Sequence, residues 1–140
     1  MTDSSKDIVR TFLGAAREGD RATVASLLHP EVQVIEAGSL PFGGVVSGVE
    51  GFNQLVRRVF TTFANTAVTI DEYIGDGDTV VVLATMSGQS KASGEAFSMP
   101  ICEIWRLRDG LITEIRPFYH DTQKINALAA GTVELANDLV

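Results

Sequence analysis

The predominant hydrophobic period of this chain changes near residue 65. Before that point apolar residues mostly recur every three or four positions, as on one face of a helix, and from there to about residue 120 they alternate every second position, as in strands. Helices followed by a series of antiparallel strands predict an α+β domain, in which one face of the sheet packs on the helices. Because 140 residues fit one domain, we expect a single domain over residues 1–140.

Two short helices are predicted at the start of the chain. Ser4 and Asp7 resemble a capping box before the first helix, and Gly19 can end it in a left-handed conformation. Asp20 can cap the second helix, which has stopped by Pro30. These signals predict a helical hairpin ahead of the first strand.

The next segment predicts a strand, a loop and a third helix. Val32, Val34 and Glu36 share one strand face, and the Gly-rich segment 38–48 is expected to be a loop. Ser47 and Glu50 form a capping box before the third helix. Its apolar residues recur with helical spacing: Phe52, Leu55, Val56, Val59, Phe60 and Phe63.

Antiparallel strands are expected over residues 66–74, 79–89, 95–108 and 111–120, and a helical tail over 122 to about 130, with a resumption after Gly131. Both faces of the 79–89 strand are apolar, so Val81 and Leu83 need a cover on the face away from the helices. A second subunit or the C-terminal tail could supply it. We favour a homodimer, because symmetric dimers are common.

Charge and composition exclude several classes of partner and site. Eleven Lys and Arg against eighteen Asp and Glu give a net charge of −7, which disfavours nucleic acid and anionic membranes as partners. The single cysteine, Cys102, cannot form an internal disulfide, and the chain has no Cys/His cluster for a metal. Without the apolar core of a signal peptide or a membrane span, we expect a cytoplasmic protein.

Cofactor motifs are missing from the sequence as well. The Gly-rich segment holds no phosphate-binding loop, no dinucleotide fingerprint and no serine-hydrolase elbow. We therefore expect neither a cofactor nor a metal. The remaining candidates for chemistry are side chains of the domain itself.

Two glutamates stand on apolar strand faces. Glu103 shares its face with four large apolar residues, Phe97, Met99, Ile101 and Trp105, and Glu36 follows Val32 and Val34 at a strand end. Burial should raise the pKa of Glu103 above that of the less enclosed Glu36. The alternative is that each glutamate pairs with an arginine, such as Arg116 or Arg57, or that the strand parity differs by one residue.

The order of these elements resembles the cone-shaped NTF2-like superfamily, within which the chain is most similar to SnoaL-like and ketosteroid-isomerase-like proteins. The resemblance covers about residues 7–121. It is carried by Val34-Ile35-Glu36, Glu103-Ile104-Trp105-Arg106 and Asp109-Gly110-Leu111-Ile112. It implies an α+β, NTF2-like (cystatin-like) fold in which N-terminal helices pack on a curved mixed or antiparallel β-sheet.

The resemblance also implies roles for site residues. Glu36 matches the general base of the ketosteroid isomerases, and Glu103 matches the acid that stays protonated there and donates to the substrate oxyanion. The family's tyrosine on the first helix falls on Phe12, and an inward aspartate of SnoaL-like cyclases falls on Pro117. Strand parity turns Tyr119 and Asp121 toward the cone, and Tyr119 is either an oxyanion donor or an ordinary core aromatic.

These matches imply a cofactor-independent isomerase or polyketide cyclase for a small hydrophobic carbonyl compound, such as a polyketide, terpenoid or steroid-like molecule. The alternatives are an epoxide-hydrolase-like enzyme and a non-catalytic module that binds a hydrophobic ligand or a protein. The expected catalytic residues are Glu36, Glu103, Tyr119 and Asp121. The expected pocket lies between the first and third helices and the concave sheet face, and it is lined by Phe12, Phe52, Val56, Phe60, Met99, Ile101, Trp105 and Pro117.

Overall fold

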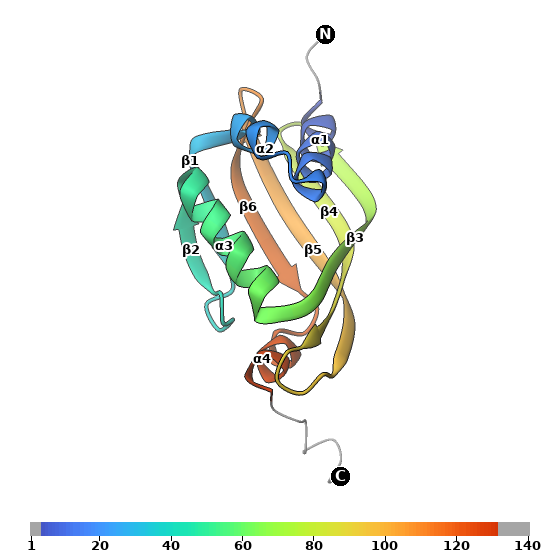
Figure 1. Ribbon diagram of the computed structural model, residues 1–140. Coiled ribbons are helices and arrows are strands. Elements are labelled where there is room, and N and C mark those ends of the chain that lie inside the picture. The colour runs from blue at the N-terminus through green and yellow to red at the C-terminus, as the bar shows by residue number, and fades with distance from the viewer. Residues whose placement is uncertain (1–3, 132–140) are drawn as a thin grey trace.

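The computed structural model describes residues 4–131 (Figure 1). The resumption of the helical tail predicted after Gly131 lies outside these residues. The helices are α1 (Ser5–Glu18), α2 (Arg21–Leu27), α3 (Gly48–Thr62) and α4 (Thr122–Ala130). The strands are β1 (Leu28–Glu36), β2 (Gly44–Ser47), β3 (Phe63–Asp76), β4 (Thr79–Ser90), β5 (Ala96–Arg108) and β6 (Leu111–Tyr119).

The six strands form one mixed sheet in the order β2-β1-β6-β5-β4-β3. Neighbouring strands are antiparallel except β1 and β6, which are parallel. The sheet curls around α1, α2 and α3, which lie over its concave face, while α4 lies at the opposite end of the molecule from α1 and α2 (Figure 1). The predicted α+β arrangement of N-terminal helices on a curved mixed sheet is confirmed.

The predicted ends of the first two helices are confirmed. The Ser4 side chain accepts a hydrogen bond from the backbone N–H of Asp7, and the Asp20 side chain accepts one from that of Thr23. Gly19 ends α1 with φ 75°, a left-handed conformation that glycine adopts without steric cost. These contacts satisfy backbone groups that the helix itself leaves unpaired.

The segment before α3 differs from the prediction in two respects. Ser47 is the N-cap of α3 but makes no side-chain capping bond, so the predicted capping box does not form. Residues 38–48 are not all loop, because β2 pairs antiparallel with the end of β1 in the register Glu36↔Gly44. The segment between these strands also folds inward, burying Leu40 and Phe42 in the core.

The inner face of β4 is core and its outer face is half-buried. Val80, Val82, Ala84 and Met86 are at most 3% exposed, whereas the outward residues Val81 and Leu83 keep partial exposure. At the far end of the strand, Ser90 Oγ donates a hydrogen bond to the carbonyl of Leu128 in α4. Within residues 4–131, no helix is both long enough and apolar enough to span a membrane.

Candidate functional site

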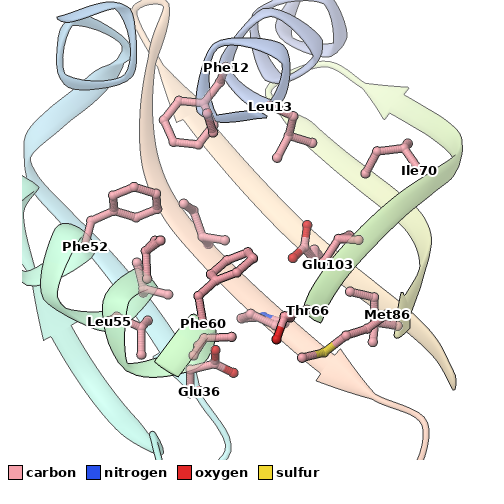
Figure 2. A pocket seen from close by; sticks show the side chains of 18 of the residues that line it. Phe12, Leu13, Glu36, Phe52, Leu55, Phe60, Thr66, Ile70, Met86 and Glu103 are labelled. Carbon is pink, nitrogen blue, oxygen red and sulfur yellow. The ribbon is translucent and has the colours of Figure 1, made fainter. Parts of the chain in front are cut away.

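A cavity of about 530 Å³ lies between α1, α3 and the concave face of the sheet (Figure 2). This is where the sequence placed the pocket. Seven of its eight expected wall residues line it: Phe12, Phe52, Val56, Phe60, Ile101, Trp105 and Pro117. The eighth, Met99, is a correction, because it is buried in the core beside its strand partner Met86, which lines the cavity instead.

The sheet register brings Glu36 and Glu103 to the same level of the cavity. Glu103 is paired with Pro117 across β5 and β6, and Val34 is paired with Ile115 across β1 and β6. Glu36, two residues beyond Val34, therefore lies beside Pro117. With neighbouring strands about 4.8 Å apart, the two glutamate backbones are about 10 Å apart, and their side chains both enter the cavity (Figure 2).

Glu36 is 5% exposed, and it is more enclosed than its place at a strand end suggested. Its Oε2 accepts a hydrogen bond from the Tyr119 hydroxyl at 3.2 Å, while its Oε1 is buried without a partner among residues 4–131. The ring of Phe42 packs edge-on against that of Tyr119, with 5.9 Å between the ring centroids. Burial raises the pKa of Glu36 to about 7, against the opposing effect of the Tyr119 hydrogen bond, and the nearby Glu103 adds to the rise.

Glu103 is half-buried in the cavity wall between Ile101 and Trp105, on the apolar face of its strand that the sequence predicted. Trp105, 2% exposed, donates from Nε1 to Glu103 Oε1 at 3.3 Å. Burial raises the pKa of Glu103 to about 7, although the Trp105 hydrogen bond opposes the rise. The expectation that the Glu36 pKa lies lower is therefore wrong, because Glu36 is itself buried and its pKa is raised to the same range.

The arginines proposed as alternative partners lie elsewhere. Arg116 Nε contacts Glu114 at 3.3 Å, and Arg57 contacts Glu50 at 3.8 Å, in both cases as partly or largely exposed pairs. Within the described residues, the hydrogen bonds of the two acids come from Tyr119 and Trp105. Within residues 4–131, then, neither the buried Glu36 nor the half-buried Glu103 forms an ion pair, although Arg17 also lines the cavity.

Of the two further predicted site residues, the structure brings one into the cavity. Tyr119 lines it, and burial together with the neighbouring Glu36 raises the pKa of its hydroxyl, so Tyr119 stays a proton donor. Asp121 is a correction. It lies outside the cavity wall as the exposed N-cap of α4, and its side chain accepts from the backbone N–H of Lys124, because the chain turns from strand to helix after Tyr119.

Sequence reasoning missed the wall supplied by β3. Thr66, Val68 and Ile70 line the cavity, and the Thr66 hydroxyl is buried without a partner. Their period-two alternation was the available signal. Within residues 4–131, no group of three or more His, Cys, Asp or Glu is placed to hold a metal ion.

Residues 9–115 match the family described as "SnoaL-like domain". The chain belongs to the SnoaL-like family. Comparison with curated proteins found no match. The predicted family resemblance is confirmed, and the SnoaL-like match spans all of the sheet except the end of β6, together with most of α1.

Solved structures share the fold of this SnoaL-like chain. An NTF2-like protein from Burkholderia thailandensis is 23% identical over 92% of this chain and 98% of its own, with a TM-score of 0.82. TerC, co-crystallised with polyporic acid, is 24% identical over 91% and 99%, with a TM-score of 0.79. A putative SnoaL-like polyketide cyclase from Jannaschia sp. CCS1 is 23% identical over 79% and 78%, with a TM-score of 0.67. At these identities the likeness establishes the NTF2-like fold.

Proposed function

We propose that this protein is a cofactor-independent acid/base enzyme that moves a proton on a small apolar carbonyl compound. The observation that carries the proposal is the pair of carboxyls, Glu36 and Glu103, which form no ion pair within the described residues and lie at one level of a largely apolar cavity. Both have a pKa raised to about 7, so near neutral pH one can be ionised while the other keeps its proton. A base and an acid are then present in the same site.

Glu36 is the proposed base. The Tyr119 hydroxyl holds Oε2, which leaves the unpartnered Oε1 as the atom that accepts a proton. In the reaction, a C–H bond next to the substrate carbonyl breaks, its proton passes to Oε1, and the electron pair moves into the carbonyl to form an enolate. Buried and without other donors at Oε1, the carboxylate is a stronger base than it would be in water.

Glu103 is the proposed acid. In its protonated form it donates a hydrogen bond to the oxygen on which the enolate charge develops. Trp105 fixes Oε1 of Glu103 and so orients the carboxyl toward the cavity. Return of the proton from Glu36 to a different carbon gives an isomer. If the enolate instead attacks a second carbonyl of the same molecule, a C–C bond closes a ring, and the alkoxide left by the broken C=O π bond takes the proton back from Glu36.

The apolar wall sets the substrate class. Phe12 contacts Phe52 at 5.5 Å and Trp105 at 5.4 Å, so the α1 end of the cavity is aromatic. A cavity of about 530 Å³ has the size expected for small-molecule sites. We infer a largely apolar substrate of a few fused or linked rings, and we offer polyporic acid, the compound crystallised with TerC, as one binding probe.

The test is turnover of β,γ-unsaturated ketones. We suggest 3-cyclohexen-1-one and androst-5-ene-3,17-dione in D₂O, following the ultraviolet absorbance of the conjugated enone and deuterium uptake by mass spectrometry. Glu36→Gln should lose at least ~100-fold in rate, because the amide cannot accept the proton. Glu103→Gln keeps an N–H donor and should lose less than Glu103→Ala.

The matched control is Glu31→Gln, an exposed glutamate on the same strand as Glu36. It removes the same charge outside the cavity and should leave the rate unchanged. If Glu36→Gln turned over as fast as Glu31→Gln, the assignment of the base would be wrong. Binding of these ketones without any turnover would instead favour a non-catalytic ligand-binding protein.

A further inference from the structure

The β3 wall of the cavity contains a β-bulge at Asn65 and Thr66. Ala64 is paired with Gln89 and Ala67 with Ser87, so two residues of β3 lie opposite the single residue Gly88 of β4. Asn65 has φ 54°, a left-handed conformation that asparagine tolerates better than most residues, and its side chain donates to Gln89 Oε1 at 2.8 Å. The backbone conformation and the side-chain hydrogen bond of Asn65 therefore both stabilise the bulge.

Because of the bulge, two β3 side chains face inward that would point to opposite faces in a regular strand. Phe63 is 1% exposed and packs edge-on against Phe97 at 5.0 Å, and Thr66, three residues later, lines the cavity. In a regular strand, residues three apart point to opposite faces. Bulges of this kind re-aim side chains and are common beside active sites.

Thr66 is the one polar residue in a stretch of wall that is otherwise apolar, with Val68 and Ile70 following it. Its Oγ1 is buried and has no hydrogen-bond partner in the part of the chain that the structure describes, whereas the Tyr119 hydroxyl donates to Glu36. A buried hydroxyl without a partner is unfavourable, and valine would fill the same space without that cost. The unmet hydrogen bond points to a ligand atom.

The sheet register separates Thr66 from Glu103. Gly88, opposite the bulge, is paired with Phe97, which is six residues from Glu103 along β5. Thr66 therefore serves a different part of a ligand than the group held at Glu103. In Figure 2 the Thr66 side chain points into the cavity, as do those of Glu103 and Glu36.

We propose that Thr66 is a specificity-determining residue whose hydroxyl hydrogen-bonds a second oxygen of the substrate, remote from its reacting carbonyl. The site then selects apolar compounds with two separated oxygen functions over compounds with one. The inference rests on the proposed function in taking the cavity as the substrate site, but it does not depend on which acid moves the proton.

The experiment is a binding comparison with two probes that differ in one oxygen: 4,4′-biphenol, with a hydroxyl at each end, and 4-phenylphenol, with one. Titration calorimetry gives the affinity of each for the unaltered protein and for Thr66→Val, Thr66→Ser and Thr69→Val. Thr69 lies on the same strand with an exposed side chain and is the matched control. Thermal unfolding of each variant without ligand gives the second readout.

We expect the unaltered protein to bind 4,4′-biphenol about 5- to 10-fold more tightly than 4-phenylphenol. Thr66→Val should remove that preference, Thr66→Ser should keep it and Thr69→Val should not affect it. Because the hydroxyl has no partner in the free protein, Thr66→Val should unfold at the same or a higher temperature.

Equal affinity for the two probes, or binding of neither, would overturn the proposal. So would a Thr66→Val variant that loses both affinities equally or unfolds at a clearly lower temperature, since either result means that the hydroxyl serves the fold. Loss of turnover in Glu36→Gln with the biphenol preference intact separates this proposal from the chemistry proposed for the carboxyls.

Discussion

Replacing Glu36 by glutamine should make the protein more stable at alkaline pH while removing the proposed base. Burial raises the Glu36 pKa from 4.5 to about 7, so the folded protein holds a proton that the unfolded chain releases between these values. The contribution of Glu36 to the free energy of unfolding therefore falls as pH rises from about 4.5 to about 7, and it stays constant above that. At about 1.4 kcal/mol per pH unit, the ionised carboxylate costs about 3 kcal/mol above pH 7.

The glutamine amide of Glu36→Gln carries no such cost. Its N–H donors are left without a partner at the position of Oε1, however, which destabilises the variant by about 1 kcal/mol. We expect Glu36→Gln to be more stable than the unaltered protein by about 2 kcal/mol near pH 8.5, and to show no gain near pH 4.5. Urea unfolding followed by circular dichroism at both pH values measures the difference. Glu31→Gln corrects for removing one charge from a chain of net charge −7.

An equal stability difference at the two pH values would refute this reasoning, because only a carboxyl that ionises inside the protein makes the difference depend on pH. A loss of stability at pH 8.5 would do the same. It would mean that the carboxylate has a compensating donor besides Tyr119.

Three further predictions concern the site and the sheet. The plot of kcat/KM against pH should be bell-shaped with its maximum near pH 7, because activity needs Glu36 ionised and Glu103 protonated. Burial raises both pKa values to about 7, so measurements from about pH 5 to about pH 9 check this. Phe42→Ala should lower the free energy of unfolding in urea by about 3 kcal/mol. It should also move the acid limb of the pH–rate profile to lower pH, since water then reaches Glu36, and an unmoved limb would show that Phe42 does not shield the carboxyl. We also expect a homodimer through the outer sheet face, so that Val81→Lys with Leu83→Lys gives monomers by light scattering, and an unaltered protein that is monomeric at micromolar concentration would contradict it.

The alternation of strand residues was sufficient to place Glu103. Its face is defined by neighbours two and four residues away, so the prediction needed no knowledge of the rest of the fold. The same holds for the caps at Ser4, Gly19 and Asp20, whose hydrogen bonds span only three to five residues. Local interactions of this kind can be predicted directly from the sequence.

The burial of Glu36 could not be predicted in that way. It depends on how segments outside β1 pack: β2 pairs with the end of β1, and the segment between them buries Phe42 against Tyr119, the hydrogen-bond partner of Glu36. The alternation puts Thr66, Val68 and Ile70 on one strand face, but which face meets the cavity depends on the bulge at Asn65, which resets the alternation after Phe63. Asp121 was misplaced because parity was extended past Tyr119, where the strand had ended.

The parallel pairing of β1 with β6 is what makes a two-carboxyl site possible. It places Glu36 beside Pro117, and the antiparallel pairing of β6 with β5 places Glu103 on the other side of the same residue. A slip of one residue in β1 would turn Glu36 to the outer face, because successive strand residues point to opposite sides. The register is held by the apolar residues Val32 and Val34, which the same slip would expose to water. The hydrophobic core thus fixes the position of a carboxyl whose ionisation destabilises the fold, and a ligand that donates a hydrogen bond to Glu36 Oε1 would recover part of that cost.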